Sequence, residues 1–111
     1  MNSCKPTVLF DQDNFCIAQC THCQRIGLTF QNLLLGFSSN EFIGLCRIMD
    51  QADFEQCSSL MSDGQLHMIV NTGHPDIQFS LSRAEFTRFQ AGLSQALRRM
   101  NLYELLKGQS N

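Results

Sequence analysis

The sequence predicts an α+β protein in which an antiparallel sheet built from β-hairpins carries two helices on one face. Three observations lead to this prediction: short β-prone runs that alternate apolar and polar residues, clusters of turn formers between them, and two Ser-x-x-Glu sequences that each open an apolar pattern of helical period. The chain has 111 residues, of which 43% are hydrophobic and 16% charged. We therefore expect one globular domain over residues 1–111.

The first expected hairpin has strands at residues 7–10 and 15–18, because β-prone runs there flank the turn formers of residues 11–14. Its second strand leads to a Cys-x-x-Cys sequence, Cys20-Thr-His-Cys23. We interpret residues 1–25 as a Cys-bearing, zinc-ribbon-like hairpin added at the N-terminus.

The next unit, residues 26–57, is expected to be a hairpin followed by a helix. Strands are predicted at 26–30 and 33–37, and Ser38 with Glu41 forms a capping-box signature. The helical pattern that begins at Phe42 fades around Cys57.

Residues 66–107 are expected to repeat this arrangement. A loop over residues 60–65 precedes strands at 66–70 and 77–81, and a second Ser-x-x-Glu sequence at Ser82 and Glu85 opens the last helix. The two capping glutamates are offset by 44 residues (85 minus 41). Because neither unit could bury its helix alone, a duplicated hairpin-helix unit with one shared sheet is predicted. The alternative is that the match reflects only the general preference for Ser-x-x-Glu at helix starts.

The six cysteines favour reduced thiols or metal ligands over a disulfide framework. The N-terminal sequence has no apolar run after a basic region, and no stretch approaches the length of a membrane span. We therefore expect a cytoplasmic protein with no membrane partner.

Cys20 and Cys23 have the spacing that lets two sulfurs face one ion, and Cys4 is the natural third ligand if its strand pairs beside them. This predicts a structural zinc site of Cys4, Cys20 and Cys23. A redox dithiol and plain buried cysteines are the alternatives. The redox alternative is weaker because a strand follows Cys23, whereas a low-pKa thiol needs a helix N-terminus there.

The fourth zinc ligand is left open among His22, His67, His74 and water. Cys16 lies too far along its strand from Cys20 to share an ion with it. Cys46 and Cys57 are interpreted as small apolar fillers.

These motifs resemble an uncharacterised family of small bacterial proteins, a domain of unknown function. The shared pattern is an early Cys, then Cys-x-x-Cys-x-x-Ile-x-Leu-x-Phe-x-Asn over Cys20–Asn32, and Leu-Ser-x-x-Glu at Leu81–Glu85. The resemblance covers nearly the whole chain. It implies Gly before Asn32, where this chain has Gln31, and it implies no activity, substrate or partner.

The charge distribution gives no reason to expect nucleic acid as a partner. The formal net charge is −2, and the eight Lys and Arg residues are scattered except for Arg98-Arg99. Catalysis is not expected either, since the sequence shows no recommended Ser, His and Asp arrangement, no Gly-rich phosphate loop and no paired carboxylates in an apolar stretch. We expect a binding or assembly module, with a metal- or thiol-dependent enzyme using the Cys-x-x-Cys site as the alternative.

The last helix carries apolar residues beyond its core stripe. Leu102, Leu105 and Leu106 fall on other faces than the stripe that ends at Met100. Either the helix breaks near Asn101, or these leucines form an exposed patch. We favour the patch and predict a homodimer through it, rimmed by Arg98 and Arg99.

Overall fold

The computed structural model describes residues 5–109 and is an α+β fold with antiparallel sheets, as the sequence predicts. In chain order its elements are β1 (Pro6–Gln12), β2 (Phe15–Cys20), β3 (Ile26–Phe30), β4 (Leu33–Phe37), α1 (Ser39–Gln51), α2 (Phe54–Cys57), β5 (Ser58–Leu60), β6 (Leu66–Asn71), β7 (Gln78–Leu81) and α3 (Arg83–Gln109). The expected hairpins and the two main helices are therefore present.

The strands form two sheets, so the prediction of a single sheet is wrong. One sheet has the order β1-β2-β3-β4 and the other the order β5-β6-β7. The first hairpin is part of the larger sheet, because β2 pairs directly with β3 from Phe15↔Phe30 to Gln19↔Ile26. The hairpin β6–β7 pairs instead with β5, a short strand that the sequence analysis placed partly in a loop.

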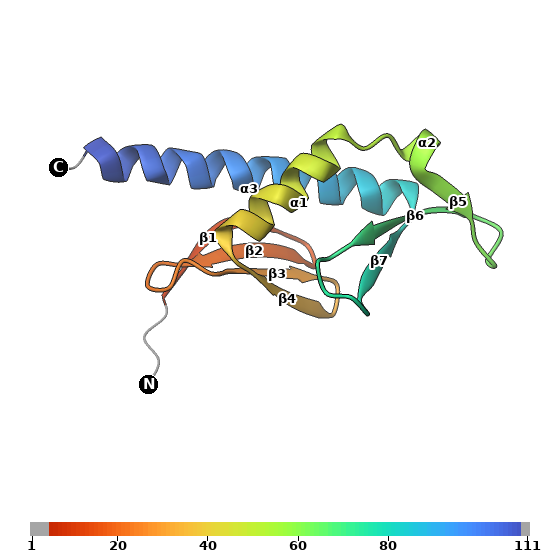
Figure 1. Cartoon of the computed structure of the whole chain (residues 1–111), viewed down its shortest axis with the longest axis horizontal. Coiled ribbons are helices and arrows are strands. Elements are labelled where there is room, and N and C mark those ends of the chain that lie inside the picture. The colour runs from red at the N-terminus through yellow and green to blue at the C-terminus, as the bar shows by residue number, and fades with distance from the viewer. Residues whose placement is uncertain (1–4, 110–111) are drawn as a thin grey trace.

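The long helices α1 and α3 lie on the same side of both sheets, and α3 runs along the length of the molecule (Figure 1). A cluster of phenylalanine rings joins the layers. The Phe89 ring of α3 lies 5.4 Å from that of Phe15 in the larger sheet and 5.0 Å from that of Phe79 in the smaller one. Phe30 lies 5.1 Å from Phe15 and 5.8 Å from Phe79 between ring centroids. These contacts hold both sheets against one helix.

Capping boxes start both long helices, as the two Ser-x-x-Glu sequences predict. Ser38 Oγ accepts the N–H of Glu41 at 3.1 Å, while the Glu41 carboxylate accepts the N–H of Ser38 at 2.8 Å. Ser82 and Glu85 make the same reciprocal pair at 3.3 and 2.9 Å. Each pair satisfies two backbone donors that a helix start would otherwise leave without a partner.

The chain between α1 and β6 is more structured than the sequence suggests. The first helix ends at Gln51 with Ala52 in an extended conformation, and Asp53 then caps the short helix α2 by accepting the N–H of Glu55 at 3.0 Å. The single fading helix that was expected here is thus two helices. Phe54 of α2 is buried against the Phe86 ring of α3, at 5.6 Å between centroids. This contact holds α2 in place after the break between α1 and α2.

The β3–β4 turn also connects to the last helix. Gln31 has a φ of 58°, the left-handed conformation that favours the glycine which the family pattern implies at this position. Its side-chain amide donates to the Glu85 carboxylate at 2.8 Å. Hydrogen bonds from the Ser82 backbone, and then from Gln31, lower the pKa of Glu85 against the opposing effect of partial burial.

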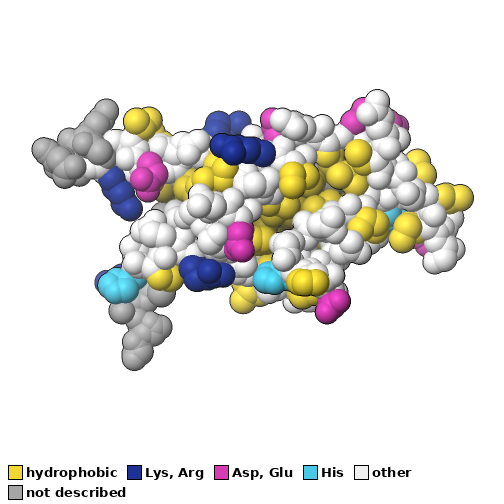
Figure 2. Space-filling view, viewed as in Figure 1, with side chains coloured by type: hydrophobic (Ala, Val, Ile, Leu, Met, Phe, Trp, Pro, Cys, Tyr) yellow, Lys and Arg dark blue, Asp and Glu magenta, His cyan; other side chains and the backbone are white. Residues whose placement is uncertain are grey.

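The space-filling view shows hydrophobic side chains at the surface between the helical layer and the sheets (Figure 2). Lys and Arg side chains are spread over that face and do not gather into one field (Figure 2).

Candidate functional site

The Cys-x-x-Cys sequence forms a tight knuckle between β2 and β3. The backbone N–H groups of His22 and Cys23 both donate to Cys20 Sγ, at 3.4 Å each. Two backbone hydrogen bonds close the loop, from Gln24 N–H to Cys20 O at 2.9 Å and from Cys20 N–H to Arg25 O at 2.8 Å. In the structure Cys20 is disulfide-bonded, contrary to the expectation of reduced thiols. After reduction these N–H donors would stabilise negative charge on the Cys20 sulfur, so the loop would then suit a thiolate ligand.

Gln24 adopts a positive φ of 67° directly after Cys23. A left-handed residue here reverses the chain so that β3 can return beside β2. Because the residue is glutamine and not glycine, this conformation could not be predicted from the sequence.

The predicted metal ligands are only partly brought together. Cys20 is half-buried at the end of β2 and Cys23 is exposed in the knuckle, whereas Cys4 lies outside the described residues. Within residues 5–109, no group of three or more His, Cys, Asp and Glu side chains is placed to hold a metal ion.

The histidines considered as fourth ligands have different surroundings. His22 lies in the knuckle itself and is exposed. His67 lies in β6, where its ring contacts Asp63 and Ser80. His74 lies in the β6–β7 turn, with its ring 6.3 Å from that of Phe37.

The other cysteines have the surroundings of packing or surface residues. Cys46 is buried in α1, its thiol donates to the Leu93 carbonyl at 3.7 Å, and burial raises its pKa to about 12. Burial, and then the nearby Asp11 carboxylate, also raise the pKa of the half-buried Cys16. Cys57 is exposed at the end of α2. The interpretation of Cys46 as a filler fits its burial, whereas Cys57 fills no part of the core.

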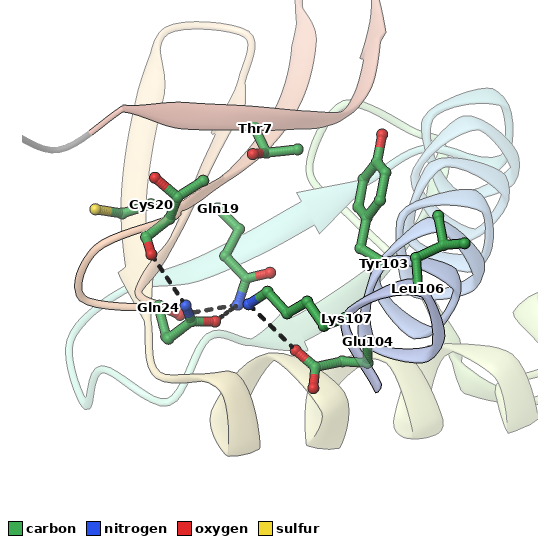
Figure 3. A pocket seen from close by; sticks show the side chains of 9 residues that line it. Thr7, Gln19, Cys20, Gln24, Tyr103, Glu104, Leu106 and Lys107 are labelled. Atoms are coloured by element: carbon green, nitrogen blue, oxygen red, sulfur yellow. Dashed lines mark hydrogen bonds and ion pairs between the residues drawn. The ribbon is translucent and has the colours of Figure 1, made fainter. Parts of the chain in front are cut away.

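A cavity of about 430 Å³ lies between the knuckle and the end of α3. Gln19 and Gln24 face it from the knuckle side, joined by a 3.3 Å hydrogen bond from Gln19 Nε2 to Gln24 Oε1. Glu104 and Lys107 face it from α3, 3.8 Å apart. Figure 3 shows the Cys20 sulfur pointing away from the other labelled side chains, so this sulfur does not face the cavity.

The three leucines that follow the core stripe of α3 are exposed at the end of this helix. The helix continues unbroken through Asn101, and Leu102, Leu105 and Leu106 are 51, 63 and 51% exposed. Tyr103 on the same turns is 40% exposed. Figure 1 shows this end of α3 projecting beyond the sheets. The expectation of an exposed patch, and not a break, is confirmed.

A second polar cluster lies in the smaller sheet. His67 Nε2 is 3.0 Å from Asp63 Oδ2, and His67 Nδ1 is 3.1 Å from Ser80 Oγ. This cluster has no local signal in the sequence, because only the β6–β7 register places Ser80 opposite Ile69 and so diagonally beside His67.

No helix within the described part of the chain is both long and apolar enough to cross a membrane.

Comparison with protein-family models matches residues 1–109 to a Family of unknown function (DUF6686), and the chain belongs to this family. No curated protein and no solved structure matches the chain.

Proposed function

We propose that this member of the family is a binding or assembly module that carries a structural zinc ion at its knuckle. The observation that carries the proposal is the pair of backbone N–H groups donating to Cys20 Sγ within a closed loop. Such donors hold a ligand sulfur in place and offset its charge before an ion arrives. Cys20, Cys23 and Cys4 are the proposed ligands, and the fourth position is filled by His22, His74 or water, since His67 is engaged by Asp63 and Ser80.

A structural role for the zinc agrees better with the surroundings of Cys20 than an enzymatic role does. A metal- or thiol-dependent enzyme needs its reactive sulfur or metal at a substrate cavity. The neighbouring cavity is lined by Gln19, Gln24, Glu104 and Lys107, while the Cys20 sulfur points away from it. The zinc would instead tie the knuckle to the chain that precedes β1, in what we infer to be a zinc-ribbon-like arrangement.

Metal analysis of protein purified anaerobically without chelator tests this site. We expect about one zinc per chain in the wild type, loss of zinc in Cys20→Ser and Cys23→Ser, and a lower unfolding temperature after chelation, because binding energy at a structural zinc is folding energy. The matched control is Cys57→Ser, which removes an exposed thiol far along the chain and should keep the metal. A wild type that contains no zinc contradicts the proposal, and a Cys4→Ser variant with unchanged zinc affinity removes Cys4 from the ligand set.

The duplicated unit is part of the same proposal. The capping boxes of α1 and α3 have the same reciprocal hydrogen bonds and follow hairpins of similar length. These local likenesses support descent of β3–β4–α1 and β6–β7–α3 from one hairpin-helix unit.

The surface through which the module assembles is proposed to be the end of α3, with a second copy of the chain as the partner. Leu102, Leu105 and Leu106 recur at three- and four-residue spacings, which places them along one helical stripe. Burying these leucines across a two-fold axis removes six from water, with a gross gain on the order of 10 kcal/mol that competes with the cost of association. Arg98 and Arg99 are exposed one turn earlier and would rim the contact.

Sedimentation velocity decides the oligomeric state. We expect the wild type to be a dimer at micromolar concentration and the double variant Leu102→Glu, Leu106→Glu to be a folded monomer, because two buried carboxylates per chain would be desolvated at the contact. Leu34→Glu is the matched control, since Leu34 is 69% exposed on β4, away from α3. A monomeric wild type, or a folded double variant that still dimerises, ends this part of the proposal.

A further inference from the structure

Three polar side chains from different parts of the smaller sheet form one hydrogen-bonded chain. Asp63 lies in the turn before β6, His67 near the start of β6, and Ser80 in β7. The imidazole bridges the other two, with Asp63 Oδ2 3.0 Å from Nε2 and Ser80 Oγ 3.1 Å from Nδ1. This is the order of groups that activates a serine hydroxyl: a carboxylate, an imidazole and the hydroxyl itself.

The Asp63 carboxylate is held in the ionised state, in which both of its oxygens can accept hydrogen bonds. The Gln65 N–H donates to Asp63 Oδ1 at 2.9 Å, and this bond first, followed by the contact with His67, lowers the pKa of Asp63. Its other oxygen, Oδ2, is then the acceptor for the imidazole. An acceptor on the Nε2 side selects the tautomer with the proton on Nε2, so Nδ1 has its lone pair directed at the Ser80 hydroxyl.

A second carboxylate stands near the same imidazole. Glu85 is held by Gln31 Nε2 at 2.8 Å, and its charge interacts with His67. His67 is partly shielded, with a side chain 17% exposed, whereas Ser80 is exposed to an incoming molecule.

Ser80 is one of the residues that line a groove with room for a small molecule. The groove has a volume of about 370 Å³ and runs between β7 and the β3–β4 turn. Its apolar lining residues are Phe30, Leu33, Phe79 and Leu81, of which Phe79 and Leu81 alternate with Ser80 along β7 and are buried, and Asn32 contributes an amide that can donate hydrogen bonds. Glu85 also lines it, so a neutral ligand fits the groove better than an anion.

We propose that Ser80 is a nucleophilic serine and that this groove takes small neutral esters with an apolar acyl group. Ser80 Oγ attacks the ester carbonyl carbon as its proton passes to His67 Nδ1. The bond to the leaving alcohol oxygen breaks, and that oxygen takes the proton from Nδ1. Water then attacks the acyl-serine, gives its proton to Nδ1, and releases the carboxylic acid as Ser80 Oγ regains its proton. Asp63 is a positioning residue that holds the imidazole. This site lies at the other end of the molecule from the knuckle (Figure 1). The two proposals can therefore be tested separately.

The test uses the full-length chain with p-nitrophenyl butyrate as substrate and an alkyl fluorophosphonate as covalent label. In the labelling reaction Ser80 Oγ bonds to phosphorus and fluoride leaves. We expect the intact mass of the wild type to rise by one label, and peptide mapping to place that label on Ser80. Ester hydrolysis should disappear in Ser80→Ala and fall by about 100-fold in His67→Ala, the usual size of a lost general base.

Ser59→Ala is the matched control. Ser59 is an exposed serine of the same sheet that lies opposite His67 in register, and its loss should leave the hydrolysis rate unchanged. Absence of a label on Ser80 in the wild type overturns the proposal without any variant, and it means that the three side chains only brace the β6–β7 hairpin. A folded Ser80→Ala variant that hydrolyses the ester at the wild-type rate overturns it equally.

Discussion

Replacing Phe89 by alanine is expected to lower the free energy of unfolding by about 3–5 kcal/mol. Phe89 has no exposed surface, and its ring stacks on that of Phe15 at an interplanar angle of 17°. It also contacts Phe30 and Phe79, at 5.2 and 5.0 Å between centroids. Its removal leaves a cavity where both sheets meet α3, and the surrounding rings belong to different elements that cannot all move in to fill it.

Urea unfolding followed by circular dichroism measures this effect. Because small domains have a total stability of about 5–15 kcal/mol, the Phe89→Ala variant should unfold at a much lower urea concentration or fail to fold. Leu105→Ala, on an exposed face of the same helix, should change the stability by no more than about 0.5 kcal/mol in monomeric protein. If the two variants unfold at similar urea concentrations, the ring cluster does not join the helix to the two sheets.

Gly92→Ala is expected to destabilise the protein, although alanine is the better helix former. Gly92 faces the first hairpin, and a Cβ atom there would overlap Phe15 Cε2 and lie 3.0 Å from Phe10 Cε2. Real Cβ atoms do not approach so closely, so α3 or the two rings must shift. Overpacking of this kind costs about 1–3 kcal/mol.

Gly44→Ala is the control that lacks this clash. Gly44 also lies inside a helix, but a Cβ there would meet nothing within 4 Å. Both substitutions gain about 1 kcal/mol from helix propensity, and this gain cancels when the two variants are compared. We expect Gly44→Ala to unfold at a higher temperature than wild type and Gly92→Ala at a lower one. If both variants are stabilised, the helix does not press on the hairpin as closely as Phe15 indicates.

The elements that could be predicted from the sequence are those whose signal is local. Strand β3 alternates apolar residues with Gly27 and Thr29, the two capping boxes are complete within four residues each, and the exposure of Leu102 and Leu105 follows from helical geometry alone. The three-residue strand β5 has no such signal, and its pairing with β6 divides the strands into two sheets. Assignment of a hairpin to a sheet depends on partners distant in the sequence, which periodicity does not specify.

The candidate sites divide in the same way. The spacing of Cys20 and Cys23 identifies the knuckle, whereas Gln24 gives no sign of its positive φ. His67 and Ser80 are separated by thirteen residues in the sequence and meet only because β6 and β7 pair in one particular register. A shift of that register by one residue would turn Ser80 to the opposite face of the sheet.

The contact between Phe15 and Phe89 has a consequence for synthesis of the chain on the ribosome. The four strands of the larger sheet emerge first and can pair locally, but the helix residue that covers Phe15 emerges 74 residues later (89 minus 15). Until α3 has left the ribosome, the apolar face of that sheet stays exposed to water, and such surfaces promote aggregation. At about 5–20 residues per second, this exposure lasts for several seconds in each round of translation. A nascent chain stalled before Phe89 should therefore recruit chaperones that bind apolar segments, and a chain released after α3 should not.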